Sequence, residues 1–159
     1  MTLRIRAAAP GDVPLIADLI RQLAKFEKLE DKVVLTEDLL RTGLFGARPF
    51  AETIIAEEDT KPIGFALFFH TFSTFLARPG IYLEDLFVLA EHRGHGVGRA
   101  LLAHLAHLAV ERGCGRLEWA VLNWNQDAIR FYERLGARPN SEWTVYRLAG
   151  EALASLGRE

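Results

Sequence analysis

The stretch that decides the fold runs from residue 81 to residue 99 and reads IYLEDLFVLAEHRGHGVGR. Residues 81–88 are apolar except for two adjacent carboxylates, Glu84 and Asp85, and this pattern predicts a strand. Glycines stand at positions 94, 96 and 98, and from Val97 apolar residues recur at helical spacing up to Gly113. Such a layout predicts an anion-binding site, because backbone N–H groups at the positive end of a helix can approach a pyrophosphate closely where glycines lack a Cβ.

The spacing of the glycines separates this loop from two common phosphate-binding motifs. A dinucleotide fold has G-x-G-x-x-G, and a P-loop has Lys followed by Ser or Thr after its last glycine. This sequence has G-x-G-x-G followed by Arg99 and Ala100, so neither motif fits. A glycine-rich turn without a ligand is the alternative.

The elements on either side of this stretch alternate between helical and strand periodicities. Before it, the sequence predicts a strand around Leu3–Ala7, a helix from Asp12 to near Glu30, a short helix capped by Thr36 and closed by Gly46, and strands at Thr53–Ala56 and Ile63–Phe72, with turns at Asp59-Thr60-Lys61 and Arg78-Pro79-Gly80. After it, the sequence predicts a strand at Leu117–Leu122, a helix capped by Asn125 and ended by Gly136, and a last strand at Val145–Leu148. The order predicts an α/β fold, with a mixed sheet flanked by helices on both faces, in one domain spanning residues 1–159.

Composition narrows the possible functions. The chain has 159 residues and a net charge of −2, from 19 basic and 21 acidic residues, which offers no field for nucleic acid or an anionic membrane. A single cysteine, Cys114, excludes an internal disulfide framework and suits a reducing compartment. Arg4 and Arg6 stand near the start without a following apolar stretch, so we expect no secretory signal and a cytoplasmic location. The longest uncharged run, residues 62–77, is too short for a membrane-spanning helix.

Several side chains could carry chemistry, and each has a structural alternative. Glu84 and Asp85 would cost several kcal/mol if buried and unpaired, and strand alternation places them on opposite faces; a structural ion pair is the alternative. Tyr132 lies on the inner face of its predicted helix, where a core tyrosine is the alternative. His104 and His107 are three residues apart on a helix without a third ligand at a suitable spacing, so we expect surface or packing residues and no metal site.

Taken together, Tyr82 to Leu148 resembles the GNAT-type N-acetyltransferase superfamily, and the resemblance extends over nearly the whole chain. The segments that resemble its diamine acetyltransferase branch are 23–30 (LAKFEKLE), 35–39 (LTEDL), 82–85 (YLED) and 124–125 (WN). Segments 120–126 (AVLNWNQ) and 150–152 (GEA) are more similar to thialysine N-ε-acetyltransferases than to spermidine/spermine acetyltransferases. The resemblance implies a mostly antiparallel sheet, acetyl-CoA as cosubstrate, a small-molecule primary amine as acceptor and a homodimer.

The resemblance also implies the residues of the site. Residues 93–98 match a loop of the form Q/R-x-x-G-x-G/A, whose backbone amides hold the pyrophosphate of acetyl-CoA. The strand before it pairs with the pantetheine arm, and Tyr132 stands near the thioester sulfur. The expected cofactor-binding residues are Leu86, Phe87, Val88, Arg93, Gly94, His95, Gly96, Val97, Gly98, Arg99, Asn125 and Ala128. The expected substrate-binding residues are Glu27, Glu84, Asp85, Glu142 and Trp143.

Aminolysis of a thioester requires a base, because an alkyl ammonium is not a nucleophile until it loses a proton. Glu84, directly or through water, is the predicted base, and burial is expected to raise its pKa. Tyr132 is the predicted acid that protonates the leaving thiolate, since an unperturbed tyrosine is protonated at neutral pH. The sequence thus predicts direct attack in a ternary complex, in which backbone N–H groups polarise the carbonyl. Cys114 has no paired histidine in its motif and is not expected to act as a covalent relay.

The range of possible acceptors is narrowed by two positions at which this sequence differs from the polyamine-specific relatives. Where those relatives have acidic and tryptophan residues, this chain has Thr74 and Leu76, which removes one reason for a long polycation to bind. Glu27, Glu30 and Asp31 form an acidic cluster at the end of the first predicted helix, and the resemblance assigns the Glu27 position to amine binding. A solvated helix end is the alternative. A thialysine-like or lysine-like amine is therefore favoured, while a polyamine and a protein lysine or N-terminus remain open.

A function of another class also stays open, namely a non-catalytic acyl-CoA-sensing module, because a fold and a loop do not prove turnover. For the homodimer, a surface of Phe65, Leu67, Phe69 and Phe72 is compatible, but these residues could equally be core.

Overall fold

The computed structural model describes residues 2–159, which divide between Ala120 and Val121 into two compact units. The first, here called the sheet unit, contains all five strands and three of the α-helices. The second, here called the C-terminal unit, contains α4 (Gln126–Arg134) and α5 (Gly150–Leu156).

The sheet has the strand order β1-β2-β3-β4-β5 and is antiparallel except for its last pair, in which β4 and β5 run parallel. The strands are β1 (Leu3–Ala7), β2 (Glu52–Glu58), β3 (Lys61–Ser73), β4 (Arg78–Val88) and β5 (Leu117–Trp119). Asp59 and Thr60 join β2 to β3 as a two-residue turn with φ of 50° and 71°, and a turn with two left-handed residues matches the twist of a hairpin. The predicted mixed sheet is confirmed.

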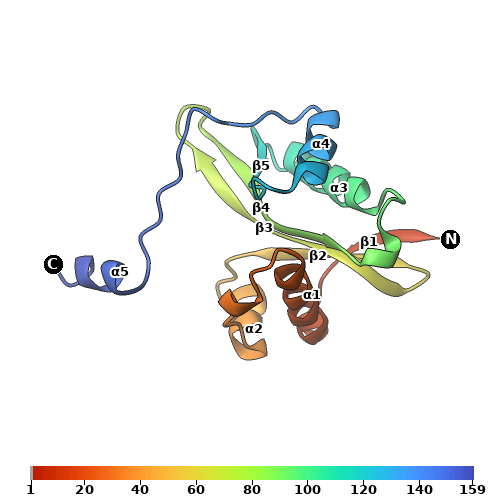
Figure 1. Ribbon diagram of the computed structural model, residues 1–159, viewed down its shortest axis with the longest axis horizontal. Helices are drawn as coiled ribbons and strands as arrows, with labels where there is room; N and C mark the ends of the chain where they lie inside the picture. Colours follow the sequence, from red (N-terminus) through yellow and green to blue (C-terminus); the bar gives the residue numbers. More distant parts are fainter. Residues whose placement is uncertain (1) are drawn as a thin grey trace. The chain divides into compact units, whose positions relative to one another are not determined.

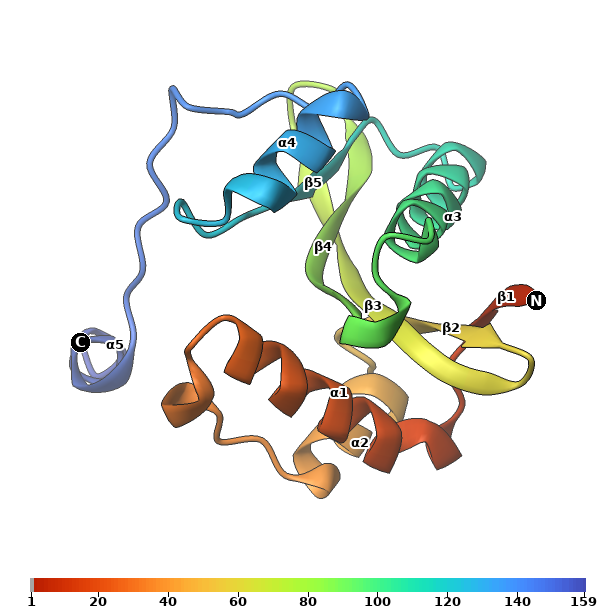
Figure 2. The ribbon, with the colours of Figure 1, turned by 45° about the vertical axis from the view of Figure 1, so that its right-hand side comes forward.

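Helices cover both faces of this sheet, as expected (Figure 1). One face carries α1 (Val13–Phe26) and α2 (Glu37–Phe45), and the other carries α3 (Val97–Glu111). Three short 3-10 turns, η1 (Pro10–Asp12), η2 (Glu30–Lys32) and η3 (Ala90–His92), lie in the connections. Figure 2 shows α1 and α2 on the side of the sheet opposite α3, with η3 in the connection from β4 to α3.

The core under α1 explains why the helix packs where it does. Leu19 and Leu23 contact Phe65 of β3 and Phe87 of β4, all at most 7% exposed. A neighbouring cluster joins Ile16, Leu44 and Ile55 of α1, α2 and β2. On the other face, α3 buries Val97, Leu101, Leu102, Leu105 and Ala109. Phe65 is therefore a core residue, whereas Phe72 is 65% exposed.

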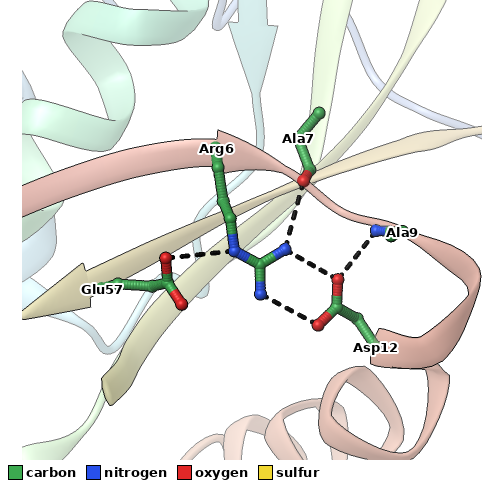
Figure 3. A network of polar contacts seen from close by, with 5 residues as sticks. All are labelled: Arg6, Ala7, Ala9, Asp12 and Glu57. Carbon is green, nitrogen blue, oxygen red and sulfur yellow. Dashed lines mark hydrogen bonds and ion pairs between the residues drawn. The ribbon is translucent and has the colours of Figure 1, made fainter. Parts of the chain in front are cut away.

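A polar network fixes the start of the chain to the sheet. The Arg6 guanidinium donates two hydrogen bonds of 2.8 and 2.9 Å to the Asp12 carboxylate, and its Nε lies 3.1 Å from Glu57 Oε1 (Figure 3). The Ala9 N–H donates to Asp12 Oδ2 at 2.7 Å. Half-buried charges thus join three parts of the chain, namely β1, β2 and the turn before α1. The hydrogen bond from Arg6 lowers the pKa of Asp12.

Four sequence predictions about element boundaries are corrected. Helix α1 ends at Phe26 rather than near Glu30, because Lys28 is left-handed (φ 62°) and Leu29 N–H bonds to the Ala24 carbonyl. This is a Schellman ending without the glycine that usually marks it. Arg78, Pro79 and Gly80 do not form a turn but begin β4, since a strand's first residues tolerate proline.

The other two corrections concern the end of the chain. Strand β5 stops at Trp119 rather than Leu122, where its pairing with β4 ends at Leu83. Val145–Leu148 is not a strand: Val145 and Tyr146 are 91% and 92% exposed, and no strand within residues 2–159 pairs with them. A strand requires a hydrogen-bonding partner, so an apolar run alone does not produce one. Helix α5, by contrast, lies where no helix is predicted.

Candidate functional site

The glycine loop has the backbone geometry of an anion site. Gly94 and Gly96 have φ of +80° and +85°, and a Cβ placed on either, or on Gly98, would meet no atom within 4 Å. Gly96 is the N-cap of α3, and because it lacks a side chain, no side-chain oxygen caps the N–H groups of the first turn. The first N–H groups of a helix have no partner within the helix, so this 15-residue helix presents donors beside open space. The loop therefore fits a pyrophosphate, and both glycines are needed at left-handed positions.

Of the other loop residues, His95 and Arg99 are exposed, whereas Val97 is 4% exposed and anchors α3 in the core. Arg93 is exposed as well, but its side chain contacts the protein. Its Nε donates to the Val88 carbonyl at 2.8 Å, and its guanidinium lies 4.7 Å from the centroid of the Phe26 ring. The sequence gives no sign of the contact with Phe26, which joins parts of the chain 67 residues apart.

The strand before the loop has a free edge beside it. Leu86 pairs with Ala66 and Val88 pairs with Gly64, so one edge of β4 is bonded to β3. On the other edge β5 pairs only with Ile81–Leu83. Within the part of the chain that the structure describes, that edge has no strand partner from Glu84 to Val88. The expected cofactor-binding residues Leu86, Phe87 and Val88 thus lie on a strand that can take up an extended ligand, as in β-augmentation.

A β-bulge brings the two carboxylates of β4 into different surroundings. Leu67 pairs with Asp85 and Phe68 with Leu83, so Glu84 is the extra residue. Opposed residues share a face of the sheet, so Asp85 lies with Leu67 on the face that α1 covers. Burial, with the charges of Glu84 and Glu27, raises the pKa of Asp85 from 3.8 to about 6. The charges acting on Asp85 are thus acidic, which disfavours the structural ion pair for it.

Glu84 corrects an expectation, because its side chain is exposed and not buried as predicted. The bulge places the burial on Asp85 instead. Glu27 is half-buried at the end of α1, and burial raises its pKa. Glu30 and Asp31 are exposed, so the alternative of a solvated helix end holds for these two and not for Glu27.

Tyr82 adds an aromatic surface that the sequence prediction missed. Its ring stacks on Phe69 at 5.3 Å between centroids. Burial raises its pKa, with contributions from the charges of Glu84 and Glu118. Tyr82 precedes Glu84 by two residues, and strand spacing was the only signal that could have grouped the two.

The remaining predicted residues belong to the C-terminal unit. Asn125 caps α4 as expected, its Oδ1 accepting a hydrogen bond of 3.3 Å from the Ala128 N–H. Tyr132 lies on α4, half-buried, with its ring centroid 5.5 Å from that of Phe131. Glu142 and Trp143 are exposed in the segment between α4 and α5.

Residues 2–159 contain neither a cluster of metal ligands nor a membrane-spanning helix. No set of three or more His, Cys, Asp or Glu side chains is arranged to hold a metal ion. His107 Nε2 lies 3.3 Å from Glu111 Oε2 on the exposed side of α3, as a surface residue would. No helix described here has both the length and the apolar character needed to cross a membrane.

Comparison with known proteins places this fold and loop in a family. The model of the acetyltransferase (GNAT) family matches residues 17–137. A thialysine N-epsilon-acetyltransferase of Bos taurus is 39% identical over 163 residues, which cover 96% of this chain and 95% of that protein. An L-ornithine N5-acetyltransferase of Arabidopsis thaliana is 36% identical, over 98% of this chain and 88% of that protein.

The fold is matched by a solved structure as well. An integron cassette protein from the mobile metagenome of V. cholerae superposes with a TM-score of 0.83 at 29% identity, over 100% of this chain and 99% of that one. The family match covers the glycine loop, the bulged strand and α4, and the relatives align over nearly the whole chain. The chain therefore belongs to the GNAT family of acetyltransferases and is an N-acetyltransferase.

Proposed function

We propose that this chain transfers the acetyl group of acetyl-CoA to the side-chain amine of a small molecule of the thialysine or lysine type, by direct attack in a ternary complex. The observation that carries the proposal is the arrangement along β4. An anion-binding loop follows the strand, and Asp85, a carboxylate of raised pKa, lies at its bulge, three residues before its end. One strand thus offers a place for a pyrophosphate and a place for an ammonium group.

Acetyl-CoA supplies the activated acyl carbon and a thiolate leaving group. The N–H groups of residues 94–99 hold its pyrophosphate, and the free edge of β4 at Leu86–Val88 pairs with its pantetheine arm. The exposed Arg99 side chain adds positive charge beside the loop. The open space at the Cβ positions of Gly94, Gly96 and Gly98 supports this fit.

The acceptor amine binds as an ammonium ion beside Glu27, Glu84 and Asp85, whose negative charges attract it. One carboxylate takes its proton, and the free amine forms a C–N bond to the acetyl carbon as the C–S bond breaks. The nitrogen then loses its second proton to solvent, which leaves a neutral amide. Glu84 is the base that the sequence predicts. The burial and raised pKa of Asp85 favour it for the same step, because a base with a pKa near the working pH is efficient. Glu84 is exposed and can then pass the proton to water.

For Tyr132 we propose the role of general acid, donating its phenolic proton to the thiolate. Glu142 and Trp143 are proposed to contact the acceptor, and Asn125 and Ala128 the cosubstrate. These roles rest on the resemblance to the family. We also propose that residues 1–159 act as one catalytic domain, as a homodimer in the cytoplasm, with neither nucleic acid nor membrane as partner.

The choice of acceptor is supported by two observations. The relatives compared above are named for acetylating nitrogen atoms of thialysine and L-ornithine, which are both diamino acids. The turn between β3 and β4, which includes Thr74 and Leu76, carries no carboxylate that would bind a long polycation. A polyamine is the second candidate, because three clustered carboxylates would also attract it.

The test is release of free thiol from acetyl-CoA with thialysine, lysine, ornithine, spermidine and a peptide amine. We expect the diamino acids to give the highest kcat/KM, and Tyr132→Phe to lower kcat while acetyl-CoA affinity is retained. Highest activity with spermidine would contradict the acceptor. No thiol release with any amine, together with a rise in melting temperature on adding acetyl-CoA, would favour a sensing module over an enzyme.

A further inference from the structure

The Arg93 side chain contacts three residues of the sheet unit, which belong to two elements, β4 and α1. Its Nε donates to the carbonyl of Val88, the last residue of β4, at 2.8 Å. Its guanidinium lies 4.7 Å from the Phe26 ring centroid at the end of α1, and 5.1 Å from that of Phe87 in the core. A planar guanidinium can donate along its edge while its faces contact aromatic rings, and a compact ammonium cannot do both.

The contact with Phe26 lies next in sequence to Glu27, the carboxylate at the acceptor end of the proposed site. Phe26 is the last residue of α1, and Glu27 is the C-cap that follows it. The backbone after Glu27 is fixed in a left-handed turn at Lys28. A contact that holds the Phe26 ring therefore restrains the backbone from which the Glu27 side chain extends. On the other side, the backbone of Arg93 leads directly into Gly94 and the anion-binding loop.

We propose that Arg93 is a positioning residue whose side chain ties the glycine loop to the end of α1, so that the donor loop and the acceptor carboxylate Glu27 are held as one unit. This inference rests on the proposed function for its kinetic consequences only. The guanidinium acts here through Val88 and Phe26, so its part in binding acetyl-CoA is to place the loop backbone. Its charge is not the property that matters.

The experiment compares Arg93→Lys, which keeps the charge, with Arg112→Lys as a matched control. Arg112 also pairs with aromatic and polar groups, lying 5.9 Å from the Phe68 ring centroid and donating to both oxygens of Glu52, but it follows the last residue of α3, at the opposite end of that helix from the loop. A third variant, Phe26→Leu, removes only the contact with α1.

Two readouts are measured for each variant. The first is amide hydrogen exchange in residues 23–32 and 93–98, which requires no substrate. The second is KM for acetyl-CoA and for the best amine of the panel. For Arg93→Lys we expect exchange in both segments to rise about tenfold, and both KM values to rise about tenfold, because a hydrogen bond from a charged donor and two aromatic contacts are weakened.

The controls separate positioning from general stability. Arg112→Lys is expected to lower the melting temperature. The rates of hydrogen exchange in both segments and both KM values should stay within about twofold of those of the parent. Phe26→Leu is expected to raise the KM for the amine about threefold, with a smaller change for acetyl-CoA. Arg93→Lys with unchanged exchange in residues 23–32, or with an effect on acetyl-CoA alone, would overturn the coupling.

If Arg93→Lys keeps full affinity for acetyl-CoA and only Arg93→Gln loses it, the positive charge binds phosphate directly. That result would also overturn the proposal. If the parent protein acetylates no amine, the proposed function fails, while the exchange measurement still decides the role of Arg93.

Discussion

The glycine loop after β4 and the carboxylates within β4 differ in the interactions that determine their structure. The loop depends on backbone conformation over six adjacent residues, with left-handed φ at Gly94 and Gly96. The carboxylate end depends on contacts between distant segments, because the charge of Glu27 acts on Asp85 from another element. The first is a local property of the chain, and the second exists only in the folded protein.

The two ends also differ in their effect on stability. A Cβ at the loop glycines would meet no protein atom, so the open space there costs no packing. Asp85 is held in a site that raises its pKa to about 6, which means that folding disfavours its charged form. Binding of a cationic acceptor would therefore offset the unfavourable free energy of the charged Asp85. The glycine loop has no comparable unfavourable interaction.

Asp85→Asn should have the largest effect on the acceptor end. If Asp85 is the base, kcat/KM should fall by about 100-fold or more. The parent's rate should fall as pH drops through about 6, because the deprotonated form is the active one. A pH–rate profile of the parent, Asp85→Asn and Glu84→Gln tests this assignment. A larger loss in Glu84→Gln would return the role of base to Glu84.

The same variant should be more stable than the parent. The folded pKa of Asp85 lies above its ordinary value of 3.8, so stability is full below that value and decreases as pH rises through about 6. At pH 8 Asp85→Asn should stabilise the protein by up to roughly 3 kcal/mol, and near pH 3.5 by nothing. Urea unfolding at both pH values is the measurement, and equal effects at the two would contradict burial as the cause.

Gly96→Val should have the next largest effect and act on the donor end. A β-branched residue at φ +85° is strained, and its side chain would enter the space assigned to the pyrophosphate. Acetyl-CoA should bind at least about tenfold more weakly, as measured by calorimetry. The control is Gly43→Ala, within α2 and also without atoms near its Cβ, which should leave binding unchanged and stabilise by about 0.5–1 kcal/mol.

Asp12→Asn should lower the stability of the protein without affecting the glycine loop or the carboxylates of β4. Its pKa is lowered by the hydrogen bond from Arg6, so its contribution is present above about pH 4 and is lost as pH falls below that. We expect a loss of about 1–2 kcal/mol at pH 7 and unchanged KM values. A change in KM would mean that the network of Figure 3 reaches the site.

Thr53→Val should give the smallest effect. Thr53 is 6% exposed, and its Oγ1 has no hydrogen-bond partner within residues 2–159. Replacing the hydroxyl with a methyl group of similar shape should stabilise the protein by up to about 1 kcal/mol. A loss of stability in thermal unfolding would show that the hydroxyl is satisfied in solution.

Much of the fold follows from local patterns, and the errors lie where long-range contacts decide. Thr36, Asn125, Gly113 and Gly136 mark helix ends as predicted, because caps are made by residues a few positions apart. The apolar run Val145–Leu148 predicts a strand that does not form, because strand formation depends on a partner elsewhere in the chain.

The sequence by itself indicated the family through its resemblance to known acetyltransferases. Residue types at fixed spacing predicted a glycine loop before a helix and placed two carboxylates in one strand. Only the tertiary structure decided which carboxylate is the less exposed, because a bulge opposite Leu67 leaves Asp85 half-buried and Glu84 exposed. It alone also revealed that Arg93 reaches Phe26, a contact between residues far apart in the chain. Burial and long-range contacts depend on how separate segments pack, which no local spacing encodes.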